Sequence, residues 1–110
     1  MDEPILEVFF FATNTGSEPV RKWLKSLPRE ERLLIGEDIK AVQYRWPVGM
    51  PLVRKLSGKV WEVRTHLPTR IARVLFAVKD AQMVLLHGFI KKAQATPQTD
   101  IRLAESRIDF

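Results

Sequence analysis

The chain contains no cysteine, which excludes disulfide bonds and metal sites built on thiolates. It has only two histidines, and neither lies in a ligand spacing such as HExxH, so we expect no zinc site. No apolar stretch reaches the ~18 residues of a membrane-spanning helix, and the N-terminal residues lack the basic and apolar regions of a signal peptide. We therefore expect a cytoplasmic protein without a metal, a cofactor or a membrane partner.

Length and composition favour one globular domain covering residues 1–110. The 110 residues are 45% hydrophobic and 28% charged, which suits a modest core rather than a disordered chain. The net charge of +5 is unevenly distributed: residues 54–92 carry nine Lys or Arg and two acidic residues, whereas residues 1–53 carry seven and eight. A segment this basic can attract nucleic acid, an anionic membrane or an acidic partner, although it can also be an ordinary solvated surface.

The first half of the chain predicts one strand and two helices. Residues 5–12 are short, apolar and rich in aromatic and β-branched side chains, so we expect a strand buried on both faces. Ser17 is a good helix N-cap before an amphipathic helix over residues 18–26. A second apolar stripe, with steps of three and four residues, predicts a helix over 29–45. Together these helices form a hairpin that can lie across a sheet.

The second half predicts a run of strands and one last helix. Short turns separate the β-like runs, which favours consecutive antiparallel strands. Thr96-Pro97 is expected to cap the last helix. The element order is therefore βααββββα, and the class is α+β because the helices and the strands segregate. The four predicted strands cover residues 52–58, 59–67, 69–78 and 83–90.

Side chains alternate between the two faces of a strand, so Glu62 and Arg64 share one face while Trp61 and Val63 face a core. Gly88 suits a bulge or a close backbone approach. If the sheet is curved, the titratable and cationic side chains could converge on its concave side. This candidate set comprises Glu62, Arg64, Arg70, Arg73, His87, Lys91 and Lys92.

Such a set suits the chemistry of a phosphodiester. Arg and Lys stabilise charge on the phosphate oxygens, and in RNA the 2′-hydroxyl can attack the adjacent phosphate without a metal. Glu62 or His87 could accept the proton. Structural explanations stand beside this one: Glu62 can pair with Arg54 or Arg64, His87 can be a hydrogen-bonded core residue, and the three tryptophans can all be core.

Two stretches, VRKLSGKVWEVRTHLPTRIARVLF and VLLHGFIKKAQATPQTDIRLAESR, resemble the RelE/ParE toxin superfamily, most closely its HigB-like, phage-derived branch. The likeness follows the whole chain in order and is dense over residues 53–107. It implies a small twisted antiparallel sheet under a helical hairpin, in the toxin of a type II toxin–antitoxin pair. The implied activity is metal-independent cleavage of mRNA, commonly in the ribosomal A site. The implied partner is a helix-turn-helix antitoxin that also represses the shared promoter.

The resemblance also implies residue roles. Arg64, Arg70 and Lys92 occupy the family's basic positions on the third strand, at the start of the fourth and after the last. Two positions depart from the pattern: Glu62 stands where RelE has a strand lysine, and no C-terminal tyrosine is present to stack on a base. The acid and the base therefore stay open. The predicted catalytic residues are Arg64, Arg70, Lys92, Glu62 and His87, and the predicted RNA-binding residues are Arg54, Lys55, Arg73 and Lys91.

Two other functions compete with the nuclease. A ParE-like gyrase poison would arrest growth with DNA damage and intact mRNA. A non-catalytic module that binds RNA, the ribosome or another protein would show salt-dependent binding and no cleaved product.

Overall fold

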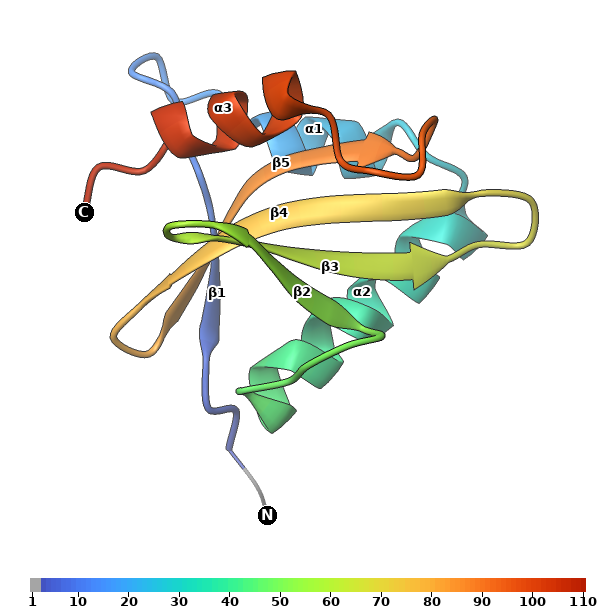
Figure 1. The fold of residues 1–110 in the computed structure, drawn as a ribbon, viewed down its shortest axis with the longest axis horizontal. Coiled ribbons are helices and arrows are strands. Elements are labelled where there is room, and N and C mark those ends of the chain that lie inside the picture. Colours follow the sequence, from blue (N-terminus) through green and yellow to red (C-terminus); the bar gives the residue numbers. More distant parts are fainter. Residues whose placement is uncertain (1–2) are drawn as a thin grey trace.

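A computed structural model describes residues 3–110 and shows an α+β fold built on one five-stranded sheet (Figure 1). The predicted order of elements, βααββββα, is confirmed. The second helix has the predicted bounds, and the first helix and the five strands differ from prediction by at most two residues at either end. The elements are β1 (Glu7–Phe10), α1 (Pro19–Lys25), α2 (Arg29–Arg45), β2 (Val53–Ser57), β3 (Val60–His66), β4 (Ile71–Lys79), β5 (Gln82–Ile90) and α3 (Gln98–Ser106).

The strands lie in the order β1-β5-β4-β3-β2. Strands β2 to β5 are antiparallel neighbours, as expected from their short links. β1 instead runs parallel to β5, so the sheet is mixed rather than wholly antiparallel. The pairing of β1 covers only Gln82–Leu85 of β5. The second half of β5 therefore has no strand beside it on that side.

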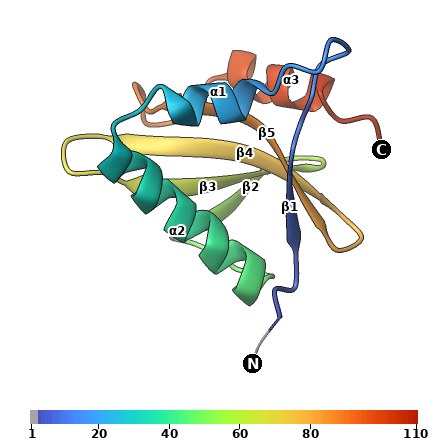
Figure 2. The ribbon, with the colours of Figure 1, turned by 180° about the vertical axis from the view of Figure 1, so that it is seen from behind.

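Each face of the sheet packs against helices. Figure 2 shows α1 and α2 lying across one face, where Ile35 and Val42 of α2 are fully buried with Val63 and Val74 of the sheet. On the other face Leu75 packs with Ala104 of α3. Neighbouring residues of β4 thus enter opposite cores, because side chains alternate along a strand. This alternation separates the charged face of β3 from the helical hairpin.

Three local expectations were wrong. The residues of β1 are exposed or half-buried rather than buried on both faces, because β1 is an edge strand. Helix α1 begins after Glu18, and Ser17 makes no side-chain cap. Helix α3 begins after Pro97 without a side-chain cap, because the hydroxyl of Thr96 turns toward the sheet instead of the helix.

Within residues 3–110, no helix combines the length and the apolar character that crossing a bilayer would require.

Candidate functional site

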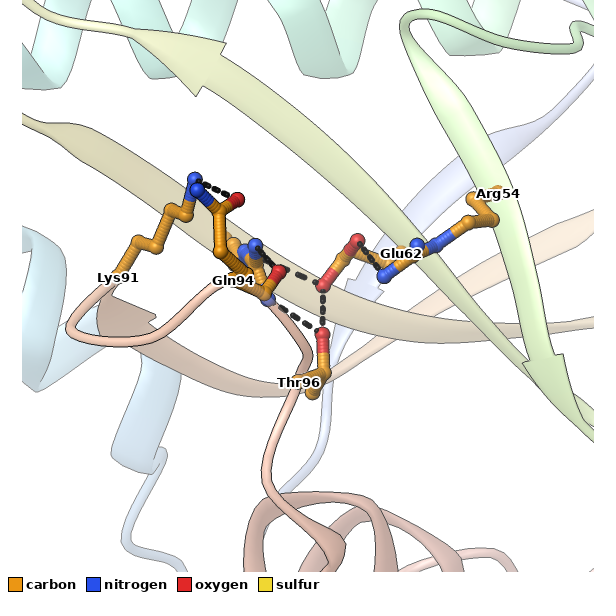
Figure 3. Close-up of polar contacts among 6 residues, drawn as sticks. Arg54, Glu62, Lys91, Gln94 and Thr96 are labelled. Carbon is orange, nitrogen blue, oxygen red and sulfur yellow. Dashed lines mark hydrogen bonds and ion pairs between the residues drawn. The ribbon is translucent and has the colours of Figure 1, made fainter.

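A buried carboxylate lies at the centre of the charged face of the sheet. Glu62 projects from β3 and is fully buried. Arg54 of β2 places Nη2 3.4 Å from Oε2, and Arg73 of β4 places Nε 3.5 Å from Oε1. Thr96, from the loop between β5 and α3, donates a hydrogen bond to Oε1 at 2.5 Å (Figure 3). One carboxylate therefore joins two strands and a loop.

Positive charge exceeds negative charge around this carboxylate. Arg54 lies opposite Glu62, and Arg64 lies opposite Arg73 in the β3–β4 pairing. The Nε atoms of all three arginines are buried and have no hydrogen-bond partner among the described residues. Burial lowers the pKa of Arg73, Glu62 opposes this shift, and Arg64 and Arg54 lower the pKa further. Because arginine stays charged in proteins, Arg54 and Arg73 share one carboxylate. With Arg64 close to Arg73, positive charge is left for an anion.

Arg73 also supports the loop of residues 91–97. Its Nη2 donates to the carbonyl of Gln94 at 2.8 Å, and its Nη1 donates to the Thr96 hydroxyl at 2.7 Å. The backbone N–H of Lys91 bonds the carbonyl of Ile71 at 2.8 Å. The loop that carries Lys92 is therefore tied to β4 at several points rather than free to move as a loose connection.

A groove of about 600 Å³ opens beside this loop. It lies at the part of β5 that β1 leaves without a strand neighbour. Its lining combines cations, apolar rings and one carboxylate, which is a mixture that suits a ligand with both charged and flat apolar parts. The lining residues are Trp23, Arg70, Arg73, Gly88, Phe89, Ile90, Lys92, Ala93, Pro97 and Asp100.

Arg70 reaches the groove from the start of β4, and an ion pair fixes its direction. Its Nε and Nη2 donate to the two carboxylate oxygens of Glu31 on α2, at 3.0 and 2.7 Å. These hydrogen bonds lower the pKa of Glu31, against the opposing effect of burial, and they raise the pKa of Arg70. The side chain of Arg70 is still 39% exposed. Arg70 therefore offers an oriented charge that Glu31 partly neutralises.

His87 is engaged beside the groove and does not line it. Its Nε2 lies 2.7 Å from Oδ1 of Asp100 in the first turn of α3. Its ring stacks on Phe89, with centroids 5.2 Å apart and planes 24° from parallel. The pair of His87 and Asp100 thus connects β5 with α3 and fixes the position of the Phe89 ring.

The comparison with protein families agrees with this architecture. A family model described as "Phage derived protein Gp49-like (DUF891)" matches residues 22–109. The chain belongs to this family. Gp49-like proteins are RelE-like toxins of toxin–antitoxin systems. The matched residues include Trp23 of α1, all of α2, the strands β2 to β5, the loop with Lys92 and α3. Together these build the groove and the arginine cluster. No curated protein matches the Gp49-like chain closely enough to be counted as a relative.

The structure of the Gp49-like chain brings together only part of the predicted site. Arg54, Glu62 and Arg73 are in contact, and Arg64 lies beside them. Arg70, Arg73 and Lys92 line the groove. The remaining predicted residues do not line the groove: His87 pairs with Asp100, Lys91 bonds Gln94, and the Lys55 ammonium lies over the Trp61 ring, 5.4 Å from its centroid.

Sequence reasoning missed three residues of the site: Asp100, Thr96 as a ligand of Glu62, and Trp23 in the groove wall. Asp100 had the appearance of an ordinary acid in the first turn of a helix. Only Gly88 gave a signal for a close approach, and the prediction was wrong about its kind, because the Trp23 ring rather than a backbone approaches Gly88.

Among residues 3–110, no three side chains of the types His, Cys, Asp and Glu lie close enough to hold a metal ion.

Proposed function

We propose that this Gp49-like chain is a HigB-like toxin that cleaves mRNA without a metal, on the ribosome and in the cytoplasm. The observation that carries the proposal is the groove itself, in which Arg70, Arg73 and Lys92 converge beside apolar rings. A nucleotide has the matching composition, since it joins a phosphate to a flat base. Family membership supports the toxin part of this proposal.

The proposed reaction is attack by a 2′-hydroxyl on the adjacent phosphorus. The new P–O2′ bond forms as the P–O5′ bond breaks, and the proton lost from O2′ is balanced by one gained at O5′. The products are a 2′,3′-cyclic phosphate and a 5′-hydroxyl. Negative charge builds on the non-bridging oxygens in the transition state. Lys92 would stabilise this charge by direct contact, whereas Arg73, which is buried and donates to Gln94 and Thr96, would act through its charge alone. Fixed cations are effective because they need no reorganisation.

Both candidate proton acceptors, Glu62 and His87, already have other hydrogen-bond partners. Glu62 is fully buried, and Thr96, Arg73 and Arg54 surround its oxygens. His87 uses Nε2 to contact Asp100. We therefore propose that Glu62 holds the arginines and the loop in place, and that charge stabilisation supplies the larger part of catalysis. That either Glu62 or His87 accepts the proton remains a prediction.

The proposed partners are mRNA on the ribosome and a helix-turn-helix antitoxin, both of which rest on the resemblance to RelE-like toxins. Charge in the groove is consistent with an RNA partner.

Primer extension on a reporter mRNA after brief induction tests the proposal. The wild type should give new 5′ ends, and Lys92→Ala should remove most of them. Lys92 is the better choice for this comparison because Arg70→Ala would also break the ion pair with Glu31. The control is Lys79→Ala, which removes the same charge at the β4–β5 turn, at the opposite end of β5 from the groove. It should cleave like the wild type.

Two outcomes would point elsewhere. Growth arrest with intact mRNA and damaged DNA would overturn the nuclease and favour a gyrase poison. RNA binding that weakens with salt, without new 5′ ends, would favour a non-catalytic module.

A further inference from the structure

The groove contains a carboxylate that the proposed cleavage chemistry does not use. Asp100 lines the groove, and only its Oδ1 atom contacts His87. No hydrogen bond joins its Oδ2 atom to another of the described residues. An acceptor of this kind is unfavourable for binding a phosphate, because both groups are negative. It is suited instead to a hydrogen-bond donor of the ligand.

The groove also has an apolar wall. Phe89 lies there with its ring held by stacking on His87, and Trp23, Ile90 and Pro97 complete the wall. Trp23 reaches this position because Gly88 has no side chain: a Cβ there would lie 2.4 Å from Cε3 of Trp23. Flat aromatic surfaces bind nucleobases by stacking, largely without regard to sequence.

The cations lie on the same groove as this wall. Lys92 is exposed on the loop, and Arg70 and Arg73 line the groove beside it. The groove lies among α1, β5 and α3, each of which contributes to its lining, and Figures 1 and 2 both show α1 and α3 close to β5. One nucleotide can therefore direct its phosphate to the cations and its base to Phe89 and Asp100.

We propose that Asp100 reads the edge of this base and selects one that carries an exocyclic amino group. This inference rests on the proposed RNA-directed function. Adenine N6, cytosine N4 and guanine N2 are hydrogen-bond donors to a carboxylate, as in the known pairing of Asp or Glu with cytosine N4. Uracil offers N3–H between two carbonyl oxygens, which a carboxylate repels. The groove should therefore bind adenine, cytosine and guanine and discriminate against uracil.

Binding to RNA that cannot be cleaved tests this selection directly. The probes are fluorescein-labelled hexamers of 2′-O-methyl adenosine, cytidine or uridine, because the methyl group blocks attack by the 2′-oxygen. Fluorescence anisotropy with the full chain should show the adenosine and cytidine hexamers binding about tenfold tighter than uridine, the discrimination expected of one good base contact.

Asp100→Asn is the decisive variant. It keeps the size and an oxygen for His87 but places an amide donor where Oδ2 was, so the preference over uridine should fall to about twofold or reverse. Asp109→Asn makes the same chemical change at an exposed residue beyond the end of α3 and should keep the full preference. Phe89→Leu should weaken all three hexamers alike, because it removes stacking and leaves Asp100 in place.

Equal binding of the three hexamers by the wild type, or no binding at all, would overturn the inference. So would an Asp100→Asn protein that keeps the wild-type preference. The proposed function fails separately: a clear base preference without new 5′ ends in cells would refute the nuclease and leave the base-reading groove standing. New 5′ ends without any base preference would support the nuclease and refute the selection of a base by Asp100.

Discussion

The hydroxyl of Thr96 donates a hydrogen bond to the buried carboxylate of Glu62 and accepts one from Arg73. All three side chains are buried. Thr96 precedes α3 by only two residues and follows Lys92 by four. This contact therefore links the charged face of the sheet to the loop that brings Lys92 to the groove. A hydroxyl is required here because it can donate to one partner and accept from the other at the same time.

Thr96→Val removes this link while preserving the shape of the side chain. The change should lower the free energy of unfolding by about 1–3 kcal/mol, because Arg73 and Glu62 each lose a buried hydrogen-bond partner. Cleavage of mRNA should fall by more than this loss of stability explains, because Lys92 loses its fixed position. Urea unfolding and primer extension measure the two effects.

Thr96→Ser keeps the hydroxyl and should recover most of the cleavage activity. Thr99→Val makes the same change at an exposed residue in the first turn of α3 and should have little effect on either measurement. If Thr96→Val cleaved as well as the wild type, the loop would not depend on this contact.

Glu62→Gln should be the more destabilising change at the same centre. The amide can still accept a hydrogen bond from Thr96, but it no longer balances the charges of Arg54 and Arg73. Removing one partner of a buried ion pair costs about 3–5 kcal/mol. Thermal and urea unfolding should show this loss, whereas Glu37→Gln, on the exposed face of α2, should stay within about 0.5 kcal/mol of the wild type. If Glu62→Gln left the free energy of unfolding unchanged, water or a movement of the side chains would be compensating the charges of the arginines.

The part of the fold that local patterns determine could be predicted from the sequence. The alternation along β3 correctly placed Glu62 and Arg64 on one face, because a strand gives its side chains no other choice. The stripe of α2 likewise predicted its bounds. The parallel pairing of β1 with β5 could not be obtained this way, because it joins residues about 75 positions apart, such as Glu7 and Gln82. No turn or spacing between them encodes the direction of pairing.

The site was predictable only where it is built from neighbouring strands. Arg54, Glu62 and Arg73 lie on consecutive strands, so alternation and short turns bring them together. Arg70 and Glu31 are 39 residues apart, and their contact depends on how the helical hairpin crosses the sheet. Lys55 shows the same limit, because its long side chain covers Trp61 rather than the groove. The charge of a residue and its place in the family's sequence pattern do not show in which direction its side chain points.

The ion pair of Arg70 and Glu31 predicts a specific dependence on pH. Hydrogen bonds from Arg70 lower the pKa of Glu31 from its ordinary value of 4.5. A lowered folded-state pKa contributes stability that is fully present above the unfolded value and is lost as pH falls through the folded value. The wild type should therefore exceed Glu31→Gln in urea midpoint at neutral pH, and the difference should shrink progressively below about pH 4.5. A difference that stayed constant from pH 7 to pH 3 would show that the charge of Glu31 contributes nothing.

Gly88→Ala tests the close approach that forms one wall of the groove. The added Cβ would lie 2.4 Å from Cε3 of Trp23, so the ring must move, at a cost of about 1–3 kcal/mol for overpacking. RNA binding should weaken as the groove wall shifts. Gly36→Ala is the matched control, because a Cβ at this helical site meets nothing within 4 Å. It should stabilise the protein by about 0.5–1 kcal/mol. If Gly88→Ala and Gly36→Ala both destabilised the protein, added bulk alone, rather than contact with Trp23, would explain the effect.

The charge of Lys92 should be measurable in the salt dependence of RNA binding. Each phosphate that a cation neutralises releases counterions from the RNA, and single strands give a slope of about −0.7 per contact in log K against log salt. If Lys92 contacts a phosphate, Lys92→Ala should reduce the steepness by about 0.7 and weaken the adenosine and uridine hexamers equally, since a phosphate contact carries no base preference. Lys79→Ala should leave the slope unchanged. A Lys92→Ala protein with the wild-type slope would place the phosphate elsewhere, with Arg54 and Arg64 as the next cations to test, because their buried Nε atoms lack partners among the described residues.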